Sequence, residues 1–182
     1  MILVTGGARS GKSAHAERLA SACGDRVLYI ATSVVTDEEM ARRVDQHRQR
    51  RPAGWLIHEG FVDLGAQVRA LAGKCDAIML ECITTLITNF MFETFPWLPP
   101  EQMDFAAIEA WIQAQLADLL AACAVCDTPV YLVTNEVGLG LVPETLLGRQ
   151  FRDIAGRVNQ QLATAADEVW LVISGIPVRI KG

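Results

Sequence analysis

The sequence predicts an α/β fold with a mainly parallel central sheet, an antiparallel edge strand and helices on both faces of the sheet. Short apolar runs alternate with longer helical patterns along the 182 residues, as in βα units. The apolar runs are nearly continuous, which is typical of parallel strands covered on both faces. A glycine-rich segment ending in Gly-Lys-Ser joins the first strand to the first helix, as it does in P-loop proteins.

Five apolar runs are the candidate parallel strands. They are Ile2–Thr5, Val27–Ala31, Ala77–Leu80, Val130–Thr134 and Val169–Ser174. A turn at Gly175-Ile176-Pro177 would return the short segment Val178–Ile180 as an antiparallel edge strand. The sequence shows no internal repeat, low-complexity tract or linker. We therefore expect a single domain over residues 1–182, which is long enough to bury a sizeable core.

The segment Gly6-Gly7-Ala8-Arg9-Ser10-Gly11-Lys12-Ser13 carries the strongest functional signal. Glycines let successive backbone N–H groups turn toward phosphates, and the start of the next helix adds its own N–H groups and positive dipole end. In such a loop the lysine reaches the β and γ phosphates, and the following hydroxyl is a ligand for Mg²⁺. The alternative is a chance match in a glycine-rich turn. The strand before and the helix after favour a site for a nucleoside triphosphate.

The segment from Thr36 to Pro52 is predicted to be a helix, because Thr36 and Glu39 have the spacing of a capping box and Pro52 ends the run. His47 shares a helical face with Met40 and Val44, so it points toward the body of the protein. Five nearby arginines form a positive patch: Arg42, Arg43, Arg48, Arg50 and Arg51. Two interpretations stay open, a site for a polyphosphate and a solvated basic helix with a half-buried histidine.

Polar residues end two of the predicted strands. Glu81 follows the run Ala77–Leu80 and is a candidate partner of the P-loop, because Mg²⁺ needs an acidic residue near it. Thr134-Asn135-Glu136-Val137-Gly138 ends another strand. Ligands of parallel α/β sheets collect at such ends, although ordinary turn chemistry also explains this segment.

Two long helices are predicted in the second half of the chain. One runs from about Asp104 to Cys123, with apolar residues along one face, and the other from about Pro143 to Ala165. The stretch Glu93–Pro100 is predicted to be an irregular surface excursion. Three arginines on the later helix either reach a bound phosphate or form ion pairs on a solvated face: Arg149, Arg152 and Arg157.

Composition narrows the class of protein. The formal charge of −5 disfavours nucleic acid as the main partner, because a phosphate backbone needs a basic face. We see no apolar run long enough to span a bilayer and no signal peptide before the P-loop, so we expect a cytoplasmic protein. The five cysteines include a lone pair, Cys123 and Cys126, without a second ligand pair, which favours small buried thiols on a helix over metal or redox chemistry.

The chain resembles the bifunctional adenosylcobinamide kinase / adenosylcobinamide-phosphate guanylyltransferase family of cobalamin biosynthesis. The resemblance covers essentially the whole chain, and the ordered set of motifs is specific. The motifs are Ile2–Ser13, Tyr29-Ile30-Ala31-Thr32-Ser33, His47-Arg48, Arg51-Pro52, Trp55, Leu80-Glu81-Cys82-Ile83-Thr84-Thr85, Val133–Gly138 and Phe151–Gln160.

This resemblance implies a RecA-like P-loop fold, a homotrimer and two activities at one nucleotide site. In the first, the γ-phosphoryl group of ATP or GTP goes to the aminopropanol hydroxyl of adenosylcobinamide. In the second, GTP guanylylates a histidine and releases pyrophosphate, and the GMP passes to adenosylcobinamide phosphate to give adenosylcobinamide-GDP. A neutral imidazole can act as the nucleophile at neutral pH.

The resemblance also implies the residues that carry these reactions. The histidine that takes the GMP falls on His47, and Lys12 is the second catalytic residue. Ser13 and Glu81 are expected to hold Mg²⁺. The expected nucleotide contacts are Gly6, Gly7, Ala8, Arg9, Ser10, Gly11, Lys12, Ser13, Ala31, Thr32, Ser33, Arg48, Gln49, Arg50, Arg51, Glu59 and Glu81.

Two rival functions are compatible with the P-loop. One is a plain small-molecule kinase without a covalent step, which leaves the arginine-rich segment around His47 unexplained. The other is a nucleotide-binding switch or interaction module that turns over no substrate. Consumption of nucleotide that depends on adenosylcobinamide separates an enzyme from such a module.

Overall fold

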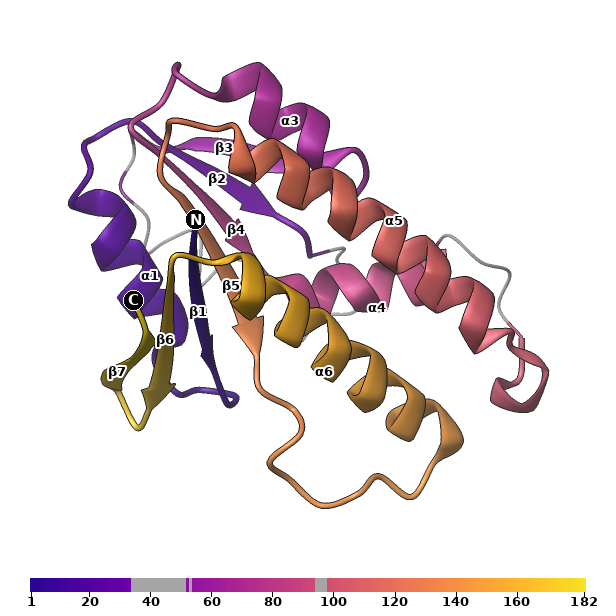
Figure 1. The fold of residues 1–182 in the computed structure, drawn as a ribbon. Helices are drawn as coiled ribbons and strands as arrows, with labels where there is room; N and C mark the ends of the chain where they lie inside the picture. The colour runs from indigo at the N-terminus through magenta and orange to yellow at the C-terminus, as the bar shows by residue number, and fades with distance from the viewer. Residues whose placement is uncertain (34–51, 53, 94–97) are drawn as a thin grey trace.

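The computed structural model describes residues 1–33, 52, 54–93 and 98–182. One seven-stranded sheet runs through it, flanked by helices (Figure 1). The elements in chain order are β1 (Ile2–Gly6), α1 (Lys12–Ser21), β2 (Val27–Ala31), β3 (Leu56–Glu59), α3 (Leu64–Leu71), β4 (Ala77–Glu81), α4 (Ile83–Glu93), a 3₁₀ turn (Pro100–Gln102), α5 (Phe105–Ala124), β5 (Val130–Asn135), α6 (Leu146–Ala165), β6 (Glu168–Ile173) and β7 (Ile176–Lys181).

The strand order is β3-β2-β4-β5-β1-β6-β7. Every neighbouring pair is parallel except β6 and β7, which form an antiparallel hairpin at one edge. The predicted P-loop α/β fold, with a mainly parallel sheet and an antiparallel edge, is confirmed. Pro177 is tolerated within β7 because an edge strand does not need every backbone donor.

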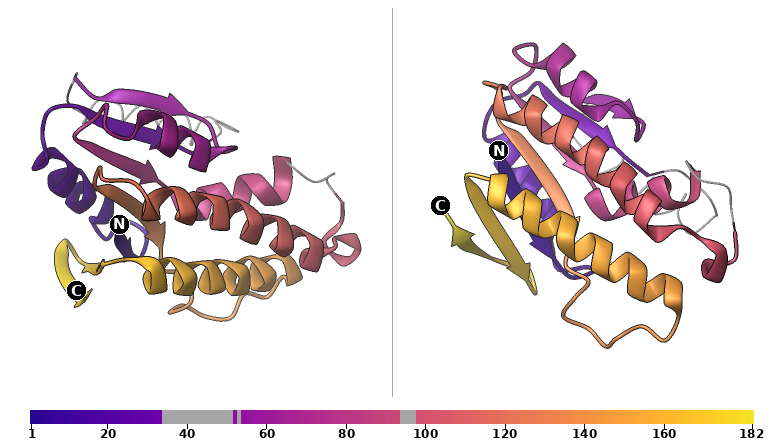
Figure 2. Two further views of the ribbon diagram at one scale, coloured as in Figure 1. Left: turned by 45° about the horizontal axis from the view of Figure 1, so that its top comes forward. Right: turned by 45° about the vertical axis from the view of Figure 1, so that its right-hand side comes forward.

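Helices cover the two faces of the sheet unequally. One face carries α3, α4, α5 and α6, and its core gathers residues such as Leu3, Ile78 and Leu132 with the buried stripe of α5. The other face carries Val4, Met79 and Val133, and among the described helices α1 alone packs there, through small residues. Figure 2 shows α5 and α6 side by side over the first face. Among the described residues, no helix is both long and apolar enough to cross a bilayer.

The structure differs from the sequence prediction in three places. The hairpin turn was expected at Gly175-Ile176-Pro177, but it consists of Ser174 and Gly175, because Ile176 and Pro177 already pair with β6 as the first residues of β7. The strand Leu56–Glu59 was not predicted, because it is a short edge strand whose apolar residues Leu56 and Ile57 are exposed and show no buried alternation. The last long helix begins at Leu146 and not near Pro143, since the Thr145 hydroxyl accepts a hydrogen bond from the Gly148 N–H at 3.1 Å and caps the helix there.

The helix predicted from about Asp104 to Cys123 is confirmed, and Asp104 caps it by accepting from the Ala107 N–H at 3.0 Å. Cys123 is buried on this helix, and burial raises the pKa of its thiol to about 12. Cys126 lies just beyond the helix, with its thiol 3.4 Å from the Thr128 carbonyl oxygen. No cluster of metal-binding side chains occurs within the described residues. Cys123 is the buried thiol on a helix that the sequence predicts, whereas Cys126 is half-buried and lies outside the helix.

A buried histidine lies next to the predicted phosphate-binding loop. His15 is on α1 and its ring packs against Trp170, with the ring centroids 4.9 Å apart. Its Nδ1 lies 3.2 Å from an Arg18 nitrogen, whereas its buried Nε2 has no partner among the described residues. Burial, and secondarily the Arg18 charge, lower the pKa of this imidazole.

We expect the free energy of unfolding to fall as the pH drops below about 6.5, because the unfolded chain then binds a proton at His15 before the folded chain does. The His15→Phe variant keeps a ring against Trp170 and cannot be protonated, so its stability should depend less on pH in this range. Urea unfolding of both proteins at about pH 8 and about pH 5.5 measures the difference. Parallel losses of stability in the two proteins would contradict the assignment.

Candidate active site

The carboxyl ends of neighbouring parallel strands bring most of the described candidate residues to one edge of the sheet. Gly6 pairs in register with Asn135 of β5, and Ala31 of β2 pairs with both Glu81 and Glu59 on its two sides. This is the edge at which open α/β sheets bind ligands. The sheet register therefore explains why segments distant in sequence lie together.

The glycine-rich loop contains residues with positive φ angles. Gly11 (φ +94°) precedes the first residue of α1, and Arg9 also has a left-handed φ of +56°. The Ser10 N–H donates to the Gly7 carbonyl oxygen at 3.2 Å, which closes the turn. Gly6 is required for a packing reason, because a Cβ there would lie 2.4 Å from the Val172 carbonyl oxygen.

Lys12 lies in the first turn of α1 and curls back over the loop. Its Nζ donates to the Gly7 carbonyl oxygen at 3.2 Å, and the residue is buried. Burial lowers the pKa of its amine, while the nearby Cys82 and Glu81 act in the opposite direction. A buried cation in contact with the glycine-rich loop gives this end of α1 the electrostatic character of an anion site.

The Glu81 carboxylate is held from two sides. The Ser13 hydroxyl donates to one of its oxygens, and the Tyr29 hydroxyl donates to the other at 2.7 Å. Ser13 belongs to α1, Tyr29 to the middle of β2, and Glu81 ends β4. Because the Ser13 proton points to the carboxylate, the lone pairs of its oxygen are directed elsewhere.

Thr32 links the ends of β2 and β4. Its hydroxyl accepts from the Cys82 N–H and donates to the Cys82 carbonyl oxygen, both at 2.9 Å, and its own N–H donates to the Glu81 carbonyl oxygen at 3.0 Å. Asn89 of α4 donates to the Thr32 carbonyl oxygen. The side chain of Thr32, predicted as a nucleotide contact, is thus already used to hold two strand ends together.

A second polar network lies at the end of β5. Asn135 donates its amide to the Thr84 hydroxyl at 2.6 Å, and Thr84 lies 3.1 Å from the Cys82 thiol. Asn159 of α6 accepts from the Thr134 hydroxyl at 2.7 Å and donates to the Asn135 carbonyl oxygen at 3.0 Å. This network ties α4 and α6 to the same edge of the sheet.

Sequence reasoning assigned no role to Tyr29 or Asn159, although both lie in segments that the family resemblance covers. Tyr29 reads as one more apolar residue of a buried strand, and only the pairing of β2 with β4 brings its hydroxyl to Glu81. Periodicity within one segment contains no information on this contact, because it depends on the strand order.

Two further predicted nucleotide contacts lie at the ends of β2 and β3. Ser33 is half-buried and Glu59 is exposed at the end of β3. His47, Arg48, Gln49, Arg50 and Arg51 lie outside the described residues. On α6, Arg157 pairs with Glu109 at 2.8 Å, which favours the ion-pair interpretation for that arginine.

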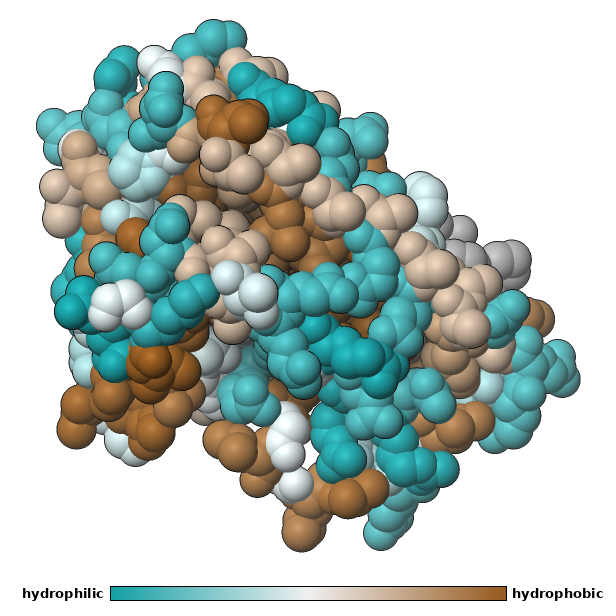
Figure 3. Space-filling model, in the orientation of Figure 1, coloured by the Kyte–Doolittle hydropathy of each residue, from teal (hydrophilic) through white to brown (hydrophobic). Residues whose placement is uncertain are grey.

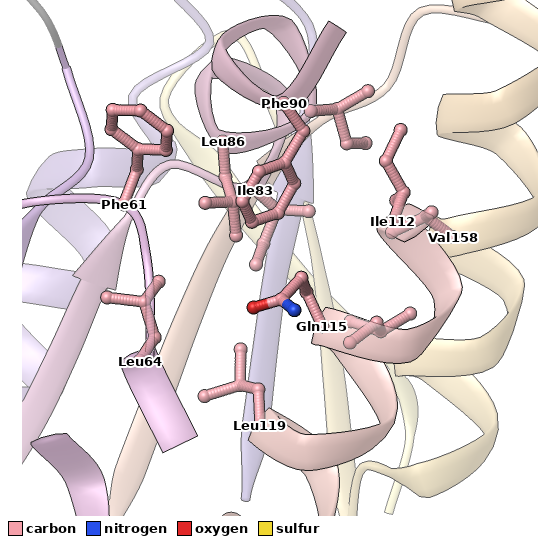
Figure 4. A pocket seen from close by; sticks show the side chains of 11 residues that line it. Phe61, Leu64, Ile83, Leu86, Phe90, Ile112, Gln115, Leu119 and Val158 are labelled. Atoms are coloured by element: carbon pink, nitrogen blue, oxygen red, sulfur yellow. The ribbon is translucent and has the colours of Figure 1, made fainter. Parts of the chain in front are cut away.

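An apolar pocket lies elsewhere, between α3, α4, α5 and α6 (Figure 4). Phe61, Leu64, Phe90 and Leu119 are among its lining residues, and Gln115 is the polar side chain that points into it. None of the predicted site residues lines this pocket. It offers no charge for a phosphate, so the strand ends remain the candidate site.

The chain matches a known protein family over almost its whole length. Residues 2–180 match the family described as "Cobinamide kinase / cobinamide phosphate guanyltransferase". The chain belongs to this family. The predicted family and enzyme class are therefore confirmed.

Curated relatives align with this chain over nearly the whole length of both sequences. It is 57% identical over its whole length to the "Bifunctional adenosylcobalamin biosynthesis protein CobU" of Salmonella typhimurium, of which it covers 99%. It is 54% identical, with the same coverage, to the protein of that name from Escherichia coli. The "Bifunctional adenosylcobalamin biosynthesis protein CobP" of Pseudomonas aeruginosa is 38% identical over 99% of this chain and 96% of the relative.

The Tyr29→Phe variant tests how much the hydrogen bond from Tyr29 to the Glu81 carboxylate stabilises the fold. Removing the phenol oxygen deletes a hydrogen bond to a carboxylate from a buried position, so the free energy of unfolding should fall by about 1.5–3 kcal/mol. The matched control is Tyr131→Phe, since Tyr131 is also buried but its hydroxyl lies 3.2 Å from the Cys23 thiol and not from a carboxylate. The control should lose about 0.5–1 kcal/mol by urea unfolding. Equal losses would contradict a special role for the Tyr29 contact.

Proposed function

We propose that this chain phosphorylates adenosylcobinamide with ATP or GTP and then transfers GMP from GTP to adenosylcobinamide phosphate. Family membership over the full length supports both activities. The observation that carries the proposal is the contact between the phosphate-binding loop and the end of β4, where Ser13 meets Glu81. A loop of this kind beside a carboxylate is the arrangement that phosphoryl transfer requires.

In this proposal the backbone amides of Gly6–Ser13 hold the triphosphate at the start of α1. The N-terminal dipole of the helix and the Lys12 ammonium group offset the phosphate charge. Lys12 exchanges its contact with the Gly7 carbonyl oxygen for a phosphate oxygen. Both reactions use the same loop.

We propose that Ser13 and Glu81 hold Mg²⁺. The residues fit this ion, because a hydroxyl whose proton is given to a carboxylate presents its lone pairs to a cation, and Mg²⁺ prefers oxygen ligands and retained waters. Such a site needs no cluster of several carboxylates, and the described residues contain none. When bound, the ion would supply positive charge that stabilises the negative charge developing on the phosphate.

In the kinase step the aminopropanol hydroxyl oxygen attacks the γ-phosphorus. The new P–O bond forms as the bond to the bridging oxygen breaks, the hydroxyl proton is released, and ADP or GDP leaves. The positioning of the triphosphate by the loop supplies most of what this reaction needs from the protein.

In the guanylyltransferase step a nitrogen of His47 attacks the α-phosphorus of GTP. A P–N bond forms, the bond to the bridging oxygen breaks and pyrophosphate leaves. A phosphate oxygen of adenosylcobinamide phosphate then attacks the same phosphorus, which breaks the P–N bond, restores the imidazole and gives adenosylcobinamide-GDP. The arginines near His47 in the sequence would stabilise the departing pyrophosphate. A homotrimer and a cytoplasmic location remain predictions.

A covalent label tests the role of His47. GTP labelled at the α-phosphate should leave an acid-labile label on the wild-type protein and none on His47→Ala, because the variant lacks the nucleophile. Phosphorylation of adenosylcobinamide should partly survive in this variant. His58→Ala is the matched control and should be labelled like the wild type. A persistent label on His47→Ala would refute the assignment, and an unlabelled wild type would favour the plain kinase.

The Lys12→Ala variant tests the shared site. We expect kcat/KM to fall by about 100-fold or more for both reactions, because the ammonium group that contacts the loop backbone is lost. Lys74→Ala, at an exposed position, should retain both activities. Loss of only one activity in Lys12→Ala would show that the two reactions do not share the loop.

A further inference from the structure

The hairpin at the sheet edge touches the phosphate-binding loop at three points. The Gly175 N–H donates to the Ser10 carbonyl oxygen at 2.8 Å. A Cβ on Gly11 would lie 3.2 Å from the Gly175 Cα, and a Cβ on Gly6 would lie 2.4 Å from the Val172 carbonyl oxygen. The backbones of the loop and of the β6–β7 hairpin are therefore in direct contact, with no side chain between them.

The hairpin turn has a geometry that fixes the direction of this contact. β6 ends at Ile173 and β7 begins at Ile176, so the turn consists of Ser174 and Gly175 alone. Their φ angles are +51° and +82°. Two consecutive residues with positive φ between antiparallel strands form the tight turn that matches the twist of a hairpin. The Gly175 N–H is consequently held in place by the strands on either side.

Because a peptide unit is planar, this hydrogen bond fixes how the loop backbone is oriented. The Ser10 carbonyl and the Gly11 N–H belong to one trans peptide unit, so they point in opposite directions. Since Gly175 holds the Ser10 carbonyl oxygen toward the hairpin, the Gly11 N–H points away from the hairpin. This N–H comes immediately before the first turn of α1, where anions bind to backbone amides.

We propose that Gly175 is a positioning residue for the nucleotide. By binding the Ser10 carbonyl oxygen, it aims the Gly11 N–H at a phosphate and keeps the loop open in its binding conformation. This inference rests on the proposed nucleotide site. It assigns a function to a turn more than 160 residues away in sequence from the loop that it supports.

The Gly175→Val variant tests the role, because a β-branched residue does not adopt a φ of +82° without strain and the turn must change. The dissociation constants of GTP and ATP should rise about tenfold. This is the effect expected from losing the hydrogen bond to the Ser10 carbonyl oxygen, which aims the Gly11 N–H at the phosphate. Gly175→Asn should bind nucleotide within about twofold of the wild type, because asparagine tolerates a left-handed φ and keeps the N–H. Open space surrounds the Cβ position, so the Cβ of neither variant creates a clash.

Gly73→Val is the matched control. Gly73 has a φ of +74°, its Cβ would also meet open space, and its N–H also donates, to the Thr128 hydroxyl at 2.9 Å. It precedes β4 and thus lies at the amino ends of the parallel strands, whereas the loop lies at their carboxyl ends. Both valine variants should lower the thermal denaturation midpoint, but only Gly175→Val should weaken nucleotide binding. If Gly175→Val does not fold, Gly175→Ala provides the same comparison against Gly73→Ala with less strain.

Equal dissociation constants for the two valine variants would overturn the proposal, since the effect would then be one of general stability. Failure of Gly175→Asn to restore binding would also overturn it. A wild-type protein that binds neither GTP nor ATP would refute the proposed function itself, and with it the role of Gly175. Normal wild-type binding that Gly175→Val leaves unchanged would refute only the role of Gly175.

Discussion

The Glu81 carboxylate joins parts of the candidate site that come from three separate segments of the chain. Ser13 and Tyr29 each donate a hydrogen bond to it, one from the helix after the loop and one from the neighbouring strand. A carboxylate at the end of a buried strand needs such donors to offset the loss of water. The contact consequently sets where the first turn of α1 lies over the sheet, and the geometry of the glycine-rich loop depends on that placement.

Most of the fold follows from local patterns in the sequence. The central strands are recognisable because burial on both faces makes each of them an unbroken apolar run. The strand Leu56–Glu59 lies at the edge, with Leu56 and Ile57 exposed, so nothing in its pattern distinguishes it from a loop. The start of α6 was misplaced because Pro143 resembles a helix start, whereas the side chain of Thr145 supplies the cap.

The candidate site was less predictable, for a physical reason. Gly6–Ser13 and Glu81 were identified because their chemistry is local: a loop that can bind phosphate and an acid at the end of a strand. The contacts of Tyr29, Thr32 and Asn159 depend on which strands are neighbours, and that information is distributed over the whole chain. The residues around His47 lie outside the described part of the structure, so their roles rest on the sequence and on the family.

The β6–β7 hairpin carries exposed apolar side chains on either side of the turn that contacts the loop. Ile173 is 56% exposed and Ile176 is 66% exposed, and Figure 3 shows apolar surface over this hairpin. Any surface that covers these isoleucines also restrains the Ser174-Gly175 turn, and through it the Ser10 carbonyl. Thermodynamic linkage then requires reciprocity: a contact that changes the affinity of the loop for its ligand is itself strengthened or weakened by that ligand to the same degree.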